Sequence, residues 1–243
     1  MRHMRKFKVF LSLLFVGVSL PACVTQVKLY DPLIYKPIRA DGIKVTYGDV
    51  SEINPVNGEK IKVAIREIRD KRPNISCLGA KPSSFDGVLF ILFPISYLFM
   101  ETGKVDVENG VIFLDLFKKH LINAFELVGF EIVPIASSDL TSMTEKESIK
   151  AFIEAEVKTF WVEFIKGFAV VGAESEVLFE ITLTEPNTNR IIWSDIFKGG
   201  NKVSSKLALR NEAFEQSINS AYAEAMKNFY RAISDDNFKN MLR

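Results

Sequence analysis

Histidine and cysteine are scarce in this sequence, whose 243 residues include two of each. His3 lies in an N-terminal segment that we expect to be removed, which leaves His120 as the single histidine of the mature chain. Most hydrolase triads and zinc sites are built around histidine, so we expect no catalytic residues and no metal site. The stretch GFAVVGAE from residue 167 has glycines at phosphate-loop spacing but lacks the lysine and hydroxyl residue that hold phosphate, and we expect no cofactor.

Acidic residues are absent from residues 1–22, a pattern typical of a secretory signal peptide. Arg2, Arg5, Lys6 and Lys8 form a basic start, and an uncharged, largely apolar run of twelve residues follows at 9–20. A helix of that length covers about 18 Å, which is too short for the roughly 30 Å hydrocarbon core of a bilayer. We therefore expect cleavage rather than an uncleaved membrane span.

The sequence LPAC at 20–23 resembles the lipobox of bacterial lipoproteins, with Leu20 at −3, Ala22 at −1 and Cys23 as the first residue of the mature chain. Pro21 departs from that pattern, in which a small or β-branched residue is commonest. The resemblance implies that Cys23 is lipidated and anchors the protein to a membrane without a transmembrane helix. The alternative is an ordinary signal peptide in which Cys23 is incidental.

The residue after the lipidated cysteine bears on which membrane is involved. In Gram-negative lipoproteins an aspartate at this place retains the protein in the inner membrane, and this sequence has Val24 there. For a bacterium with two membranes, the resemblance therefore implies the periplasmic face of the outer membrane.

An excess of one charge sign is also missing. Loss of residues 1–22 removes four of the 31 basic residues and leaves 27 against 30 acidic ones, a net charge of about −3. This balance gives no reason to expect nucleic-acid binding or a polybasic membrane patch. The partners that we expect are the membrane, through Cys23, and a protein of the cell envelope or a second copy of the chain.

Lipidation would consume one of the two cysteines and leave Cys77 as a lone thiol. We expect Cys77 to be a small buried hydrophobic residue. The alternatives are a reactive thiol, an intermolecular disulfide or, if Cys23 carries no lipid, a disulfide between the two.

The mature chain divides into two parts. Residues 23–58 carry Pro32, Pro37, Pro55 and the turn signal Asn57-Gly58 with little periodicity, so we expect a lipidated N-terminus and a tether. Residues 59–243 then form a single globular domain.

The first half of this domain predicts a strand, a helix and a second strand. Apolar residues alternate from Ile61 to Ile65, and Pro73 ends the segment. At residues 110–128 the apolar period becomes helical, and Gly129 is a suitable C-cap. Residues 130–135 form a strand that Pro134 restricts to an edge or an end. This order implies parallel neighbouring strands joined by a crossover helix.

The second half predicts a meander and a terminal helix. The apolar phase of the strand from 153 shifts near Lys158 and Thr159, which indicates a β-bulge. The turn-rich sequence EPNTNR at 185–190 predicts a hairpin between its flanking strands. Apolar residues from Leu207 to Ala232 predict a long helix. The fold class that we expect is α+β, a mixed β-sheet with two main amphipathic helices packed on one face.

Three of these segments, IREIRDKRP, LVGFEIV and LTEPNTNRIIWSD, resemble successive landmarks of YajG-type bacterial envelope lipoproteins. Those proteins have a strand ending in a D-x-R-like segment, a helix ending in Gly-Phe and a Trp-bearing strand after a polar turn. The same order of elements recurs in the CsgG and LpoB groups, which serve as partners in secretion or peptidoglycan synthesis. The resemblance implies no functional residues.

A few polar residues invite a functional interpretation. His120 falls about 60° from the centre of the apolar helix face, so we expect a boundary histidine with a local hydrogen bond. Glu154 and Glu156 share one face of a strand, where we expect exposed charges rather than an acid/base pair. RDKRP at 69–73 is expected to be a solvated loop rather than a site for headgroups or an anionic polymer.

Charge is missing altogether from the thirteen residues 88–100, which Pro94 interrupts. The run is too short to span a bilayer, and the proline breaks a continuous helix. It is either a buried core segment or a contact for the membrane, for a partner or for a second copy. Its candidate contact residues are Leu89, Phe90, Leu92, Phe93, Tyr97 and Phe99.

These observations favour a non-catalytic, membrane-anchored lipoprotein that faces the periplasm and scaffolds or regulates an envelope protein complex. The alternative is a carrier lipoprotein that binds a lipid or another amphiphile with the apolar segment as a pocket wall.

Overall fold

A computed structural model of the protein describes eight ranges of the chain. They are residues 24–36, 46–47, 60–81, 103–108, 111–135, 148–166, 171–205 and 211–243.

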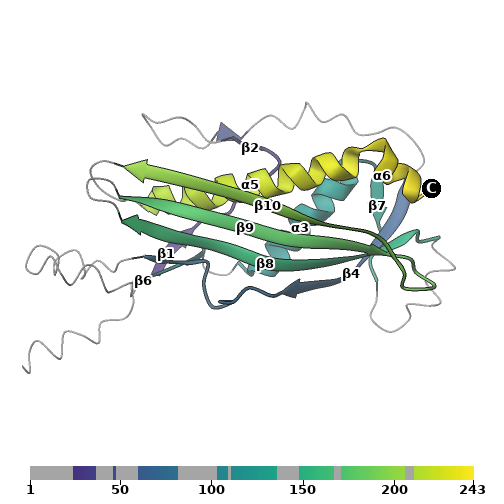
Figure 1. The fold of residues 1–243 in the computed structure, drawn as a ribbon, viewed down its shortest axis with the longest axis horizontal. Coiled ribbons are helices and arrows are strands. Elements are labelled where there is room, and N and C mark those ends of the chain that lie inside the picture. The colour runs from purple at the N-terminus through teal and green to yellow at the C-terminus, as the bar shows by residue number, and fades with distance from the viewer. Residues whose placement is uncertain are drawn as a thin grey trace, which may run out of the picture.

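The described strands form one strongly curved mixed sheet and a separate small pair (Figure 1). The longest strands, β8 (Ala151–Lys166), β9 (Val171–Thr184) and β10 (Ile191–Ser205), pair antiparallel in the order β8-β9-β10. The other edge of β8 is shared, because its first half pairs in parallel with β4 (Ile61–Asp70) and its second half with β5 (Gly79–Lys81).

The sheet continues beyond β4 and β5 in two branches. At one end β7 (Phe130–Ile132) lies parallel to β4. At the other end β6 (Gly103–Val107) lies antiparallel to β5, and β1 (Val24–Val27) lies parallel to β6. The small pair consists of β2 (Tyr35–Lys36) and β3 (Thr46–Tyr47).

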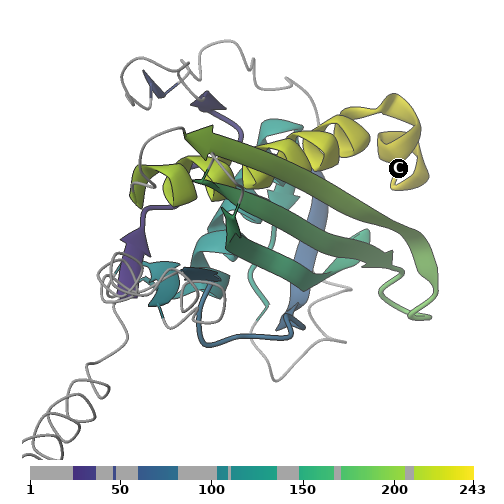
Figure 2. The same ribbon diagram turned by 60° about the vertical axis from the view of Figure 1, so that its left-hand side comes forward.

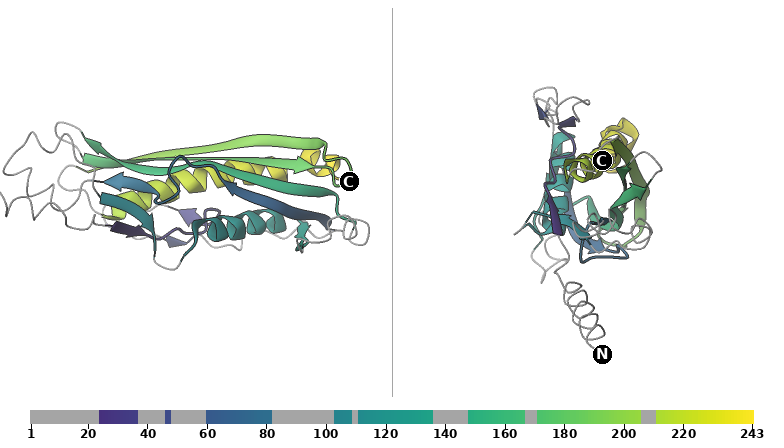
Figure 3. Two further views of the ribbon diagram at one scale, coloured as in Figure 1. Left: turned by 90° about the horizontal axis from the view of Figure 1, so that it is seen from below. Right: turned by 90° about the vertical axis from the view of Figure 1, so that its left-hand side faces the viewer.

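Two helices, α3 (Phe113–Leu127) and α5 (Asn211–Ser234), cover one face of the sheet, and the short α6 (Asp236–Met241) follows α5 (Figure 2). Seen along the long axis, the strands curl around α5, and no helix of the described ranges covers their other face (Figure 3). The predicted α+β class, with two main helices on one face of a mixed sheet, is therefore confirmed. We call the helix-free face the outer face.

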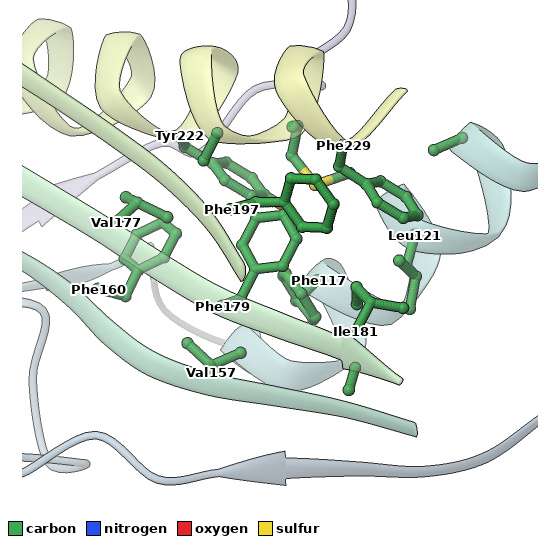
Figure 4. Close-up of a cluster of buried hydrophobic side chains, with 14 of the residues drawn as sticks. Phe117, Leu121, Val157, Phe160, Val177, Phe179, Ile181, Phe197, Tyr222 and Phe229 are labelled. Carbon is green, nitrogen blue, oxygen red and sulfur yellow. The ribbon is translucent and has the colours of Figure 1, made fainter. Parts of the chain in front are cut away.

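Aromatic side chains fill the space between the sheet and the helices (Figure 4). The ring of Phe117 on α3 meets Phe179 on β9 with centroids 5.3 Å apart, and Phe125 meets Phe229 on α5 at 5.3 Å. Along β9, Val177, Phe179 and their inward neighbours alternate with outward residues and are fully buried. Edge-to-face contacts of this kind stabilise a core beyond the area that they bury.

The predicted strand, helix and strand appear as β4, α3 and β7. The register of β4 and β7 is parallel, as expected for a crossover. Gly129 ends the helix with φ of 94°, a conformation that side chains with a Cβ rarely adopt. β7 ends the sheet order, so Pro134 just beyond it removes no ladder hydrogen bond.

The predicted bulge and hairpin are also present. The pairing of β8 with β9 shifts between Val157 and Thr159, next to the expected position. The hairpin loop closes through the amide of Glu185, which donates to the carbonyl of Arg190 over 2.8 Å. β10 runs on to Ser205, and α5 packs along its second half.

Residues 24–36 differ from the tether that the sequence predicted. Val27 is completely buried in β1, and Tyr35 is 1% exposed beneath α5. The side-chain amide of Asn219 on α5 holds this segment in the manner of a strand edge: it donates to the carbonyl of Lys28 and accepts from the amide of Tyr30, each over 2.8 Å. Residues 24–36 therefore pack against the sheet and α5 instead of forming a free tether.

Candidate functional site

The N-terminus of β1 lies at one end of the sheet together with several chain connections. Val24 is in register with Lys104, and Lys81 at the end of β5 is in register with Gly103 at the start of β6. Because β5 runs parallel to β8, the end of β8 and the start of β9 lie at the same end. We call this the β1 end of the sheet; it lies on the left in Figure 1.

The residues predicted as lipidation and contact sites lie outside the described residues. These are Cys23, Leu89, Phe90, Leu92, Phe93, Tyr97 and Phe99. The structure places only their described neighbours, Val24, Lys81 and Gly103, on β1, β5 and β6.

A hollow of about 750 Å³ lies on the outer face, where β8, β9 and β10 run side by side. We call it the outer groove. Two rows of outward-facing residues cross it: Trp161, Glu176 and Gly200 form one row, and Glu163, Glu174 and Lys202 form the next. The other residues that line it include Arg72, Pro73, Asn74, Lys198 and Asn201.

The charges of the outer groove are largely balanced. Lys198 approaches Glu176 to 2.6 Å, and Lys202 approaches Glu174 to 3.5 Å. The hydrogen bond from Lys198 to Glu176 raises the pKa of the lysine, so Lys198 is charged at neutral pH. The groove thus presents ionic donors and acceptors side by side, around an aromatic ring.

The loop from β4 to β5 forms one rim of the groove, and it differs from the solvated loop expected at 69–73 at Arg72, which is buried while Lys71 and Pro73 are exposed. The guanidinium of Arg72 lies 4.3 Å above the ring of Phe113, and its side chain is 5% exposed. Asp70 accepts hydrogen bonds from Nε and Nη2 of Arg72 over 2.8 and 2.7 Å. Burial raises the pKa of Asp70, but its bonds with Arg72 outweigh this and hold the pKa below its ordinary value.

His120 is buried, with 4% of its surface exposed, and does not lie at the boundary that the helical wheel predicted. Its Nδ1 is 3.0 Å from the hydroxyl of Tyr222 on α5, so its partner is distant in sequence and not local. Burial lowers the pKa of His120 to about 4, although the nearby charge of Asp31 acts in the opposite sense. At neutral pH the ring is therefore uncharged and structural.

Glu154 and Glu156 are not free strand charges. Glu154 is 19% exposed and lies 3.1 Å from Arg66 and 2.8 Å from Arg69. Glu156 lies 3.2 Å from Arg69 as well. These pairings hold both carboxylates in a network of ion pairs on the outer face.

Cys77 is free and buried, as predicted. The described residues gather no cluster of His, Cys, Asp and Glu that could hold a metal ion. Among the helices that the structure describes, none has the length and apolarity needed to cross a membrane.

Sequence reasoning missed the outer groove. Its signal was present in the alternation of β8, where Phe160, Val162 and Phe164 point into the core and Trp161 and Glu163 must therefore point outward. Trp161 on the polar face of the strand could have drawn attention to this site. The other residues of the groove lie on β9 and β10, and the sequence alone does not predict how these strands pair with β8.

No family model matches the sequence, and no curated protein matches it. Among solved structures, the chain is similar to a homolog of neuraminyllactose-binding hemagglutinin from Helicobacter pylori, with 14% identity, 88% of this chain and 96% of that chain covered, and a TM-score of 0.45. Protein XCC0632 from Xanthomonas campestris is similar with 10% identity, 90% of this chain and 95% of that chain covered, and a TM-score of 0.41. Lipoprotein GNA1162 from Neisseria meningitidis has 9% identity, 75% of this chain and 99% of that chain covered, and a TM-score of 0.26. At such identities and TM-scores, no activity carries over to this chain.

Proposed function

We propose that this chain is a non-catalytic, lipid-anchored protein of the bacterial cell envelope, whose domain stands on the membrane at the β1 end of its sheet. In this role its outer face is turned to the periplasm and scaffolds a partner protein. The lipobox-like sequence at 20–23 supports the anchor. An outer face that no described helix covers, and that carries the ion pairs of Glu154, Glu174 and Glu176, supports the scaffold.

The observation that carries this proposal is the position of β1. Cys23 directly precedes Val24, which is in register with Lys104. Residues 82–102 leave the sheet after Lys81 and return at Gly103, on the two strands next to β1. Since neighbouring strands are about 4.8 Å apart, Val24, Lys81 and Gly103, the described residues next to Cys23 and to this segment, lie within roughly 10 Å of one another.

This arrangement favours the membrane as the contact for the uncharged run 88–100. An acylated Cys23 would hold the β1 end at the lipid surface, because β1 is hydrogen-bonded into the sheet and allows no long tether. The chain would then leave the domain toward that surface. We propose that Leu89, Phe90, Leu92, Phe93, Tyr97 and Phe99 contact the same bilayer.

The scaffold role is favoured over catalysis and over carriage of an amphiphile. His120 and Glu154, whose side chains are of the types most used in acid–base catalysis, are each engaged in a structural contact. Ring contacts fill the space between the sheet and the helices, so no observation of the described residues favours an interior lipid site.

Replacement of the lipidated residue tests the anchor. Cys23→Ser should abolish incorporation of labelled palmitate and leave an uncleaved precursor or a soluble periplasmic form. Cys77→Ser is the matched control, and it should retain the label and the membrane fraction. A Cys23→Ser protein that still incorporates the label would contradict the proposal.

Crosslinking from native envelopes with the wild-type chain then tests the scaffold role, which predicts a specific protein adduct.

A further inference from the structure

The outer groove owes its depth to a glycine. On β10, Lys198, Gly200 and Lys202 all point outward, and Gly200 has no side chain to fill the space between the two lysines. A Cβ at Gly200 would meet only the carbonyl oxygen of Ser175, at an ordinary 3.7 Å. The fold therefore accepts a larger residue here, and the hollow is not forced by the backbone.

Trp161 offers its ring to this space. Its side chain is half-buried in the row that also contains Glu176 and Gly200. Among the residues that the structure describes, it has no ring contact and no hydrogen bond, whereas Trp193 packs against Phe197 and Phe238. An indole placed in a hollow without partners provides an apolar surface and a free N–H donor for a ligand.

The charges around the ring indicate the kind of ligand. A strongly cationic ligand would have to displace Lys198 and Lys202 from their glutamates, and an anionic one would meet three glutamates. A neutral ligand with many hydroxyl groups can use both signs at once, because carboxylates accept its hydroxyl protons while lysine and asparagine side chains donate to its oxygens. Asn74 and Asn201 add such groups at the rim.

We propose that the outer groove binds an uncharged oligosaccharide, with the C–H face of one pyranose ring stacked on Trp161. Gly200 leaves room for the ring, and Glu163, which has no partner among the described residues, accepts hydrogen bonds from its hydroxyl groups. The hollow of about 750 Å³ lies within the size range of small-molecule sites, roughly 300 to 1,000 Å³. This site does not depend on the lipid anchor.

Tryptophan fluorescence of the purified full chain in detergent tests the site. The sequence has two tryptophans, so Trp193→Phe leaves Trp161 as the single reporter. Titration with chitotetraose and with cellotetraose should change its emission saturably with at least one of them. Binding of both indicates that hydroxyl groups suffice, and binding of chitotetraose alone indicates a need for the N-acetyl group. Either result supports the proposal.

Two variants locate the site, with affinity measured by calorimetry. Gly200→Gln should fill the groove and weaken binding about tenfold or more while the melting temperature stays unchanged. Trp161→Ala should weaken binding by a similar factor, also with an unchanged melting temperature, because the stacking contact is lost. Ser204→Gln, which is exposed further along β10, is the control and should bind as the wild type does. Equal affinity of Gly200→Gln and the wild type, absence of saccharide binding, or a response to tetralysine instead would overturn the proposal.

Discussion

His120 shows at the scale of one residue how burial sets chemistry in this protein. Its ring is enclosed by α3 and α5, with Tyr222 as its hydrogen-bond partner and Asp31 and Lys119 as the nearby charges. Burial lowers its pKa to about 4, while an unfolded histidine titrates near 6.5. The hydroxyl of Tyr222 stays neutral throughout, because burial raises its pKa well above the ordinary value.

This difference makes stability depend on pH in a defined window. Between pH 6.5 and pH 4 the unfolded chain binds a proton at His120 that the folded chain does not, so the free energy of unfolding falls as the pH drops. A pKa shift of this size contributes roughly 3 kcal/mol to the free energy of unfolding at neutral pH, and this contribution is fully lost near pH 4. Urea denaturation at a series of pH values measures the slope.

Other carboxylates titrate in the same window, so the slope must be compared between two chains. His120→Gln keeps an amide that can bond the hydroxyl of Tyr222 but cannot titrate. This variant should lose less stability between pH 6.5 and 4 than the wild type. Equal losses in the two proteins would show that His120 is not the group responsible.

At the scale of single elements, α3 gives the most direct prediction. Phe117 is 1% exposed and contacts Phe179, whereas Lys119 is exposed on the opposite side of the helix. Phe117→Asp would bury an unpaired charge and should cost about 3 kcal/mol or more of unfolding free energy. Lys119→Asp should change it by less than about 1 kcal/mol. Thermal melts of both variants measure this, and equal melting temperatures would contradict the packing of α3.

Elements with a clear apolar period were predictable from the sequence. Short strands, and the β1 segment that hydrogen bonds to Asn219 hold in place, were not. α3, β9 and α5 each present a long apolar face, so local pattern and burial agree. β5 and β6 have three and five residues, too few for a period to stand out. β1 did carry a signal, since Thr25, Val27 and Leu29 are alternately buried, but the prolines that follow concealed it.

The candidate site was less predictable than the fold, for a physical reason. The depth at which His120 lies depends on α5, and the pairing of Arg72 with the ring of Phe113 depends on a loop that leaves the sheet between β4 and β5. The outer groove likewise needs the register of β8, β9 and β10. Each is set by tertiary contacts between distant segments, which a periodicity along one segment does not contain.

At the scale of the whole molecule, the two ends of the sheet are expected to differ in their environment. β10 runs from Ile191 to Ser205, and at about 3.3 Å per residue this strand separates its ends by roughly 45 Å. Its last residue is in register with Val171 at the β1 end, which we propose to face the membrane. Ile191 and Ile196, which are 62% and 52% exposed, lie toward the other end.

Liposome flotation of the chain expressed from Val24, without an acyl group, tests this polarity. Leu92→Glu with Phe99→Glu should weaken flotation several-fold, because a charge in the bilayer is costly, while the free energy of unfolding stays within about 1 kcal/mol of wild type. Ile191→Glu with Ile196→Glu is the matched control, which exchanges two apolar residues in the same way but should float as the wild type does. Severe destabilisation by the first pair, with flotation unchanged, would place residues 88–100 in the core. Loss of self-association instead of flotation would assign them to contact with a second copy, and either outcome would remove the membrane from the account of this segment.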